Sequence, residues 1–198
     1  MIPTLRNPVK TLLVLAPHCS EDRNPALPEP RATTNTNGYA NGVAVDSNMT
    51  RMFVACGELG LSIYDISDFQ DGHEAYPLIN WLDTPGYAES VVLNEVDSIA
   101  YIAAEDAGLQ IIDYKNIENP QIIGSLSSGG NAIEIMYENN LVYLSLERGG
   151  FQVVDVANPT DPKEIARLDL QRAKGFDMDD SYIYVADDIE GLIIIKKP

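Results

Sequence analysis

The chain of 198 residues is 45% hydrophobic and 22% charged, which is typical of one well-buried globular domain or two small ones. Thirty acidic residues against thirteen lysines and arginines give a net charge of −17, and such a field repels nucleic acid and anionic membranes alike. Neither is expected as a partner, and no apolar run reaches the roughly 20 residues of a membrane-spanning helix.

The first predicted element is a strand over residues 7–15, an apolar run that follows Asn7-Pro8. Its apolar part is too short for the core of a signal peptide, so no signal peptide is visible. Residues 16–37 are rich in Pro, Asn and Thr and are predicted to form a long irregular insertion.

From residue 38 onward the sequence repeats itself four times. In each copy an aromatic residue precedes a glycine by seven positions, and these glycines stand at 60, 108, 150 and 191, which are 48, 42 and 41 residues apart. A fixed period of this length indicates a repeat architecture. The predicted copies span about 38–82, 86–126, 130–169 and 172–198.

Each copy contains short β-branched and aromatic runs bounded by Gly, Asp, Asn and Pro, which predict strands. Strand A is expected at 42–45, 90–93, 132–137 and 175–178, strand B at 52–55, 99–103, 141–145 and 182–186, strand C after each repeated glycine, and strand D at 77–82, 121–126 and 164–168. Strand C is apolar on both faces, as in a sheet packed between two others. We therefore predict an all-β protein, a β-propeller of four four-stranded antiparallel blades.

The fourth copy ends at Pro198, after strand C, and lacks a strand D. The strand predicted over 7–15 has the Asn-Pro lead-in and apolar character of strand D. We expect it to complete the last blade, so that the ring closes by pairing the two ends of the chain.

Several recurring segments resemble the LVIVD repeat family. They are Gly38-Tyr39-Ala40, Gly86-Tyr87-Ala88, Gly108–Asp113 and the segment 151–159, which ends in Asn158-Pro159. The resemblance implies a propeller, commonly in bacterial or archaeal cell-surface proteins and mostly without an established activity, and it transfers no catalytic residues. Four repeats leave three arrangements open: a compact four-bladed ring, two chains sharing a larger ring as a homodimer, or the C-terminal part of a longer protein.

The turns between strands B and C and the connections from D to A are predicted to open on one face. They bring together acidic turns from all four copies, aromatic residues from the first two and cations from the last two. The functional interpretation is a partner face made of Tyr39, Tyr87, Glu105, Asp106, Glu147, Arg148, Asp187 and Asp188. The structural alternative is that turn residues are polar because turns face water.

A second predicted site lies at the mouth of the channel, where equivalent positions hold Asn41, Glu89, Asn131 and Lys174. Asn and Glu oxygens are ligands that calcium prefers, so Asn41, Glu89 and Asn131 are weak candidates for a metal site. Lys174 opposes a metal, and it could pair with Glu89 across the channel instead.

The remaining candidates have structural interpretations. Asp65, Asp113 and Asp155, at the ends of strand C, are predicted to cap turns. His18 and His73 fall in irregular insertions, while Cys19 and Cys56 allow either one disulfide or two free thiols.

No catalytic motif is present in the sequence. The favoured function is a non-catalytic interaction module that presents an acidic propeller face to a protein or a glycan, without a cofactor. The alternative is a calcium-dependent binding protein or a hydrolase that uses the channel mouth, with Glu89 as a general base.

Overall fold

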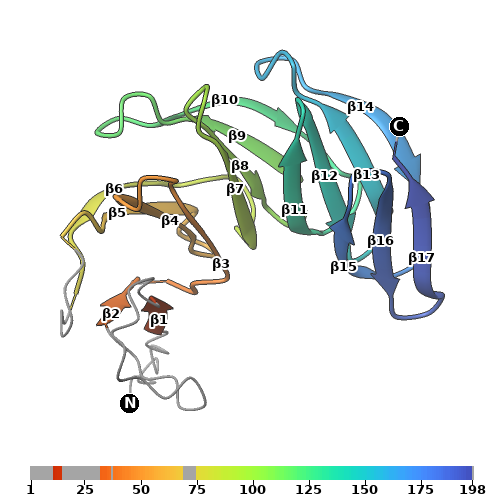
Figure 1. Cartoon of the computed structure of the whole chain (residues 1–198), viewed down its shortest axis with the longest axis horizontal. Helices are drawn as coiled ribbons and strands as arrows, with labels where there is room; N and C mark the ends of the chain where they lie inside the picture. Colours follow the sequence, from red (N-terminus) through yellow and green to blue (C-terminus); the bar gives the residue numbers. More distant parts are fainter. Residues whose placement is uncertain (1–10, 15–31, 37, 69–74, 198) are drawn as a thin grey trace, which may run out of the picture.

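The computed structural model describes residues 11–14, 32–36, 38–68 and 75–197. Four antiparallel sheets follow one another along the chain and fan about an axis in an open arc (Figure 1). The first strands of successive sheets lie next to one another on the inner side of this arc. The protein is therefore all-β and of propeller type, as predicted.

Each sheet is a meander whose strands run outward in chain order. The first sheet contains β3 (Gly42–Val45), β4 (Arg51–Ala55), β5 (Leu61–Asp65) and β6 (Leu78–Leu82). The second contains β7 (Ser90–Asn94), β8 (Ile99–Ala103), β9 (Leu109–Asp113) and β10 (Gln121–Leu126). The third contains β11 (Ala132–Glu138), β12 (Leu141–Leu146), β13 (Gly150–Asp155) and β14 (Lys163–Leu168). The fourth has three strands, β15 (Ala173–Met178), β16 (Tyr182–Asp187) and β17 (Gly191–Lys196).

The repeated glycine is required where the third strand of each sheet begins. Gly60, Gly108 and Gly150 have φ values of +70°, +74° and +88°, which side chains rarely adopt. A Cβ at each of them would also overlap the carbonyl oxygen of the last residue of the adjacent outer strand. The glycine therefore fixes how the outer strand joins the sheet.

Three hydrophobic clusters fill the spaces between successive sheets. Within the third strand, alternate side chains point toward the next sheet or back toward the preceding one. Leu61 and Ile63 of the first sheet pack against Ile112 of the second, and Leu109 and Ile111 of the second pack against Val154 of the third. The third and fourth sheets meet in the same way, through Phe151, Val153, Phe176, Ile183 and Val185. The core is thus a set of interfaces between sheets, and every internal sheet is covered on both faces.

The predicted closure of the ring by the N-terminal strand is not confirmed. Thr11–Val14 forms β1, which pairs with β2 (Ala32–Asn35) in a separate hairpin. This hairpin lies beside the first sheet, where the backbone N–H of Tyr76 donates to Thr34 Oγ1 at 2.9 Å. Among the residues that the structure describes, no strand pairs with the outer edge of β17.

The position of β2 explains the difference. Thr36, just after β2, and Thr84, just after β6, each stand two residues before a Gly-Tyr-Ala segment. Strand β2 therefore takes the outer, strand D position, and β1 is its strand C partner. The fourth sheet already contains a strand C, β17, and among the described residues it lacks only a strand D. Because β1 holds a strand C position, it does not complete that sheet.

Candidate functional site

Backbone contacts hold the predicted turn face together. Gly57, in the β4–β5 turn, forms a two-way bridge with Ala88, just before the second sheet, and both bonds are 3.0 Å long. Glu105, in the β8–β9 turn, bridges Ala132 of the third sheet in the same way. These two turns are therefore fixed to the start of the following sheet and lie on the same face of the arc.

The predicted partner-face residues differ in how they meet solvent. The rings of Tyr39 and Tyr87 lie 6.4 Å apart, and the ring of Tyr87 covers Gly57. Asp187 is buried, and its carboxylate accepts hydrogen bonds from the backbone N–H groups of Arg172, Ile189 and Glu190. The exposed members of the partner face are Tyr39, Asp106, Arg148 and Asp188, while Tyr87, Glu105 and Glu147 are half-buried.

The structure shows a separate contact for each of the four residues predicted at the channel mouth. Lys174 forms an ion pair with Glu147 of the preceding turn, and this contact lowers the pKa of the Glu147 carboxyl. The Asn41 side chain donates to the carbonyl oxygen of Ala88 at 3.1 Å. Asn131 uses its backbone carbonyl to accept from the N–H of Glu147, and the backbone N–H of Glu89 donates to Ala103. Lys174 is thus engaged by the turn of the preceding sheet.

The three aspartates at the ends of the third strands are turn caps, as predicted. The carboxylates of Asp65, Asp113 and Asp155 accept from the backbone N–H two residues ahead, at 2.8–2.9 Å. Within the described parts of the chain, no group of three or more His, Cys, Asp or Glu side chains could hold a metal ion. The same residues include no helix long and apolar enough to cross a membrane.

Cys56 is a free thiol buried at the back of the first sheet, beside Ser62. Burial raises the pKa of this thiol. Cys19, His18 and His73 lie outside the described residues.

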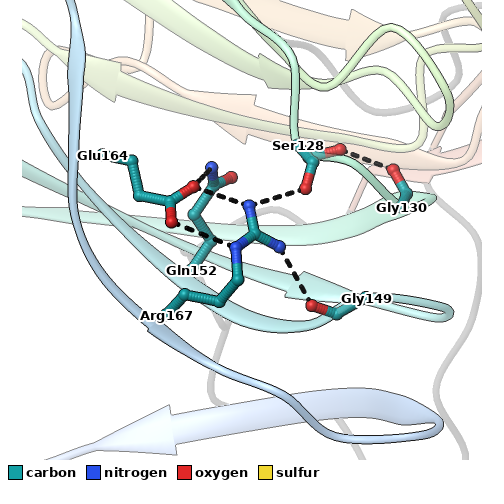
Figure 2. A network of polar contacts seen from close by, with 6 residues as sticks. All are labelled: Ser128, Gly130, Gly149, Gln152, Glu164 and Arg167. Carbon is teal, nitrogen blue, oxygen red and sulfur yellow. Dashed lines mark hydrogen bonds and ion pairs between the residues drawn. The ribbon is translucent and has the colours of Figure 1, made fainter.

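A polar network links the second and third sheets at the outer rim (Figure 2). The Arg167 guanidinium, on β14, lies between two backbone carbonyls and donates to Ser128 O at 2.7 Å and to Gly149 O at 3.0 Å. It also forms an ion pair with Glu164, which in turn accepts from Gln152 at 2.7 Å. The bond to Arg167 lowers the pKa of the Glu164 carboxyl. The guanidinium thus fastens the third sheet to the connection that leaves the second.

The outer rim of the first sheet contains a crevice instead. Its volume is about 230 Å³, and the 53% exposed side chain of Trp81 forms part of its wall. The other lining residues in the described part of the chain are Thr36, Leu59, Ser62, Tyr64 and Leu78. The sequence favoured packing at the rim over partner contact for Trp81, although a tryptophan where the next two copies have Ser125 and Arg167 was a usable signal.

The fourth sheet leaves one apolar face uncovered. Leu192 and Ile194 are 68% and 59% exposed. Their equivalents two sheets earlier, Leu109 and Ile111, are fully buried against the third sheet. This free face, made of Tyr184, Ala186, Leu192 and Ile194, therefore has the residues of an interface between sheets without a covering sheet among the described residues.

Solved structures resemble the chain at low sequence identity. The computationally designed Ika8 protein is 12% identical, with a TM-score of 0.66 over 85% of this chain and 49% of that one. The computationally designed Ika4 protein is also 12% identical, with a TM-score of 0.67 over 87% of this chain and 100% of that one. A functionally unknown protein from Desulfotomaculum acetoxidans DSM 771 is 13% identical, with a TM-score of 0.60 over 79% and 55%. The chain thus spans about half the length of Ika8 and of the D. acetoxidans protein.

No curated protein matches the chain. The LVIVD repeat matches residues 85–127, 129–169 and 173–195, which together make up more than half of it. These three segments coincide with the second, third and fourth sheets. The chain therefore belongs to the LVIVD repeat family.

Proposed function

We propose that the protein is a non-catalytic interaction module whose turn face binds a basic segment of a partner protein. The observation that carries this proposal is the bridging of the first two turns to the following sheets, which brings the exposed carboxylates of Glu58 and Asp106 onto one face. Asp188 is exposed in the corresponding turn of the fourth sheet. A net charge of −17 adds a long-range attraction for cations. Electrostatic complementarity of this kind speeds association and favours partners of the opposite charge.

The Tyr39–Tyr87 pair supports the same proposal. The two rings stand beside the β4–β5 turn, where Glu58 is exposed. Aromatic rings contribute contact area at a small entropic cost and also attract cations over their faces. A basic segment lying across this turn would meet both a carboxylate and an aromatic surface.

The test is the titration of a lysine- and arginine-rich peptide by calorimetry at low and high salt. The variant Glu58→Gln/Asp106→Asn removes two charges from the turn face. The control Glu118→Gln/Asp180→Asn removes two exposed charges from turns at the opposite end of the sheets. The proposal predicts weaker binding in the first variant only and weaker binding at high salt. Equal losses in both variants would show that only the net charge matters and would refute a specific face.

We also propose that a second copy of the chain covers the free face of the fourth sheet. The support is the repeat itself, because Leu192 and Ile194 hold positions that are buried against a following sheet in the other copies. Uncovered apolar faces of this kind favour association. Sedimentation over a dilution series should show a dimer that dissociates in Leu192→Asp but not in the control Leu168→Asp, on β14. A monomer at every concentration would refute the second copy.

A further inference from the structure

The crevice of the first sheet and the polar network of the third sheet occupy the same place in the repeat. Leu59, Ser62 and Tyr64 stand one residue before, two after and four after Gly60. Gly149, Gln152 and Val154 have the same offsets from Gly150. Three of the six described lining residues of the crevice therefore have equivalents in or beside the network.

The strand register gives two more equivalents. Across the β5–β6 pair, Trp81 faces Ser62 and Leu78 faces Tyr64. Across β13–β14, Arg167 faces Gln152 and Glu164 faces Val154. Trp81 thus stands where the third sheet has its arginine, and Leu78 where it has the carboxylate.

The sixth position is Thr36, the equivalent of Ser128. The Thr36 hydroxyl donates to the carbonyl of Gly38, and the Ser128 hydroxyl donates to the carbonyl of Gly130. Thr36 lies in the segment that leads into the first sheet, and Ser128 lies in the segment that leads into the third. Together the six positions place the crevice where the Arg167 guanidinium lies in the third sheet.

The carbonyl at the position of Leu59 receives a side-chain donor in the two following copies. In the third sheet the donor is the Arg167 guanidinium, which reaches Gly149. In the second sheet the Gln110 side chain donates to Ala107 at 3.0 Å. In the first sheet the residue equivalent to Gln110 is Ser62, which is much shorter. Among the described residues, no side chain donates to the Leu59 carbonyl, and the Thr36 carbonyl accepts from the backbone N–H of Gly38 alone.

We propose that this crevice binds the guanidinium of an arginine side chain supplied by a partner protein. The inference rests on the proposed function and names the residue that the partner would insert. The guanidinium would donate to the carbonyls of Leu59 and Thr36, as the Arg167 guanidinium does at the equivalent pair, and would stack on the indole of Trp81.

Charge and size agree with this occupant. Glu58 is exposed directly before Leu59, and the whole chain carries a charge of −17. A volume of about 230 Å³ is below the roughly 300–1,000 Å³ of pockets for drug-sized ligands and suits a single side chain. Lysine is a poorer fit, because an ammonium group is a point charge that lacks the planar fork needed to reach two carbonyls while stacking.

The test uses a short glycine-serine peptide, capped at both ends, whose only charge is one central arginine, and the same peptide with lysine in that place. Trp81 is the only tryptophan of the chain, so its fluorescence reports directly on the crevice. We expect a saturable change with the arginine peptide and a dissociation constant at least about fivefold weaker with lysine.

Variants locate the site by calorimetry. Trp81→Ala should weaken arginine binding about fivefold or more. Leu78→Glu/Trp81→Arg rebuilds the residues of the third sheet and should abolish binding because the crevice is then filled from within. The control Tyr182→Ala removes another exposed aromatic residue and should bind like the parent protein.

Two outcomes would overturn the inference. One is that neither fluorescence nor calorimetry detects the arginine peptide. The other is that Trp81→Ala binds the arginine peptide as tightly as the parent protein does, while Glu58→Gln/Asp106→Asn binds the lysine- and arginine-rich peptide more weakly than the parent protein. That result would support the turn face and refute the crevice. Conversely, arginine binding that depends on Trp81, with the basic peptide unaffected by the turn variant, would support the crevice and refute the turn face.

Discussion

A pair of leucines at one repeat position tests how the sheets are held together. Leu109 begins β9 and is fully buried between the second and third sheets, beside Leu144 and Val154. Leu192 has the same position in β17 and is 68% exposed. The substitution to alanine is chemically identical at both sites, so any difference in its cost comes from what covers the side chain.

Truncation of a buried leucine removes its transfer free energy and leaves a cavity, at a cost of about 2–5 kcal/mol. An exposed substitution changes stability by about 0.5 kcal/mol. Leu109→Ala should therefore lower the free energy of unfolding by about 2–4 kcal/mol more than Leu192→Ala does.

The measurement is urea denaturation at concentrations low enough to keep the chain monomeric, with unchanged m-values as the check on comparability. Equal losses for the two variants would refute the reasoning. They would mean that Leu192 is covered within the monomer, and hence that the arc is closed.

Two further predictions concern single residues. Gly108→Ala should lower the free energy of unfolding by about 1–3 kcal/mol, because φ is +74° and a Cβ would lie 2.6 Å from Ser128 N. Gly191→Ala is the control: its φ is +84°, but the space around it is open, so the loss measured in the same urea assay should be smaller. Burial raises the pKa of Glu134 above 4.5, so the native state holds the proton more tightly and stability falls as pH rises from 4.5 to the native pKa. Glu134→Gln keeps an acceptor for the Phe176 N–H. It should flatten this part of the stability–pH curve and raise the free energy of unfolding at pH 7. An unchanged curve would contradict the assignment of this pH dependence to Glu134.

The strands of the repeat were predictable because each carries its own local pattern. The β-branched and aromatic runs around Gly60, Gly108, Gly150 and Gly191 predict strands close to those observed. All four glycines are required by a positive φ, and at Gly60, Gly108 and Gly150 a close backbone contact adds a second requirement. A repeated local requirement is visible in the sequence four times over.

The N-terminal hairpin was not predictable in the same way. Strand β2 has the sequence Ala-Thr-Thr-Asn, which lacks an apolar alternation, and its partner β1 lies at the far end of an insertion. Lead-in residues Asn7-Pro8 suggested the strand D position for the first run, but pairing with β2 places it in the strand C position. The usable signal was Thr36, two residues before Gly38-Tyr39-Ala40, as Thr84 stands before Gly86.

The candidate site was predictable only in part. The sharing of one face by the turns follows from the meander of each sheet, but the direction of a side chain does not. Asp187 is turned inward as a cap, and Lys174 pairs with Glu147 of its neighbour. Trp81 stands in the crevice of the first sheet at the position of Arg167 in the third sheet (Figure 2). This correspondence becomes visible only when the two sheets are compared in the structure.

The most direct test of the open arc is amide hydrogen exchange along the outer edge of β17, compared with β13. In β13 both edges are paired, whereas no described strand covers the far edge of β17. At monomeric concentrations, alternate amides of β17 that point away from β16 should exchange much faster than the matching amides of β13. Equal protection of the two strands would contradict the account, because it would require a further strand to be paired with β17.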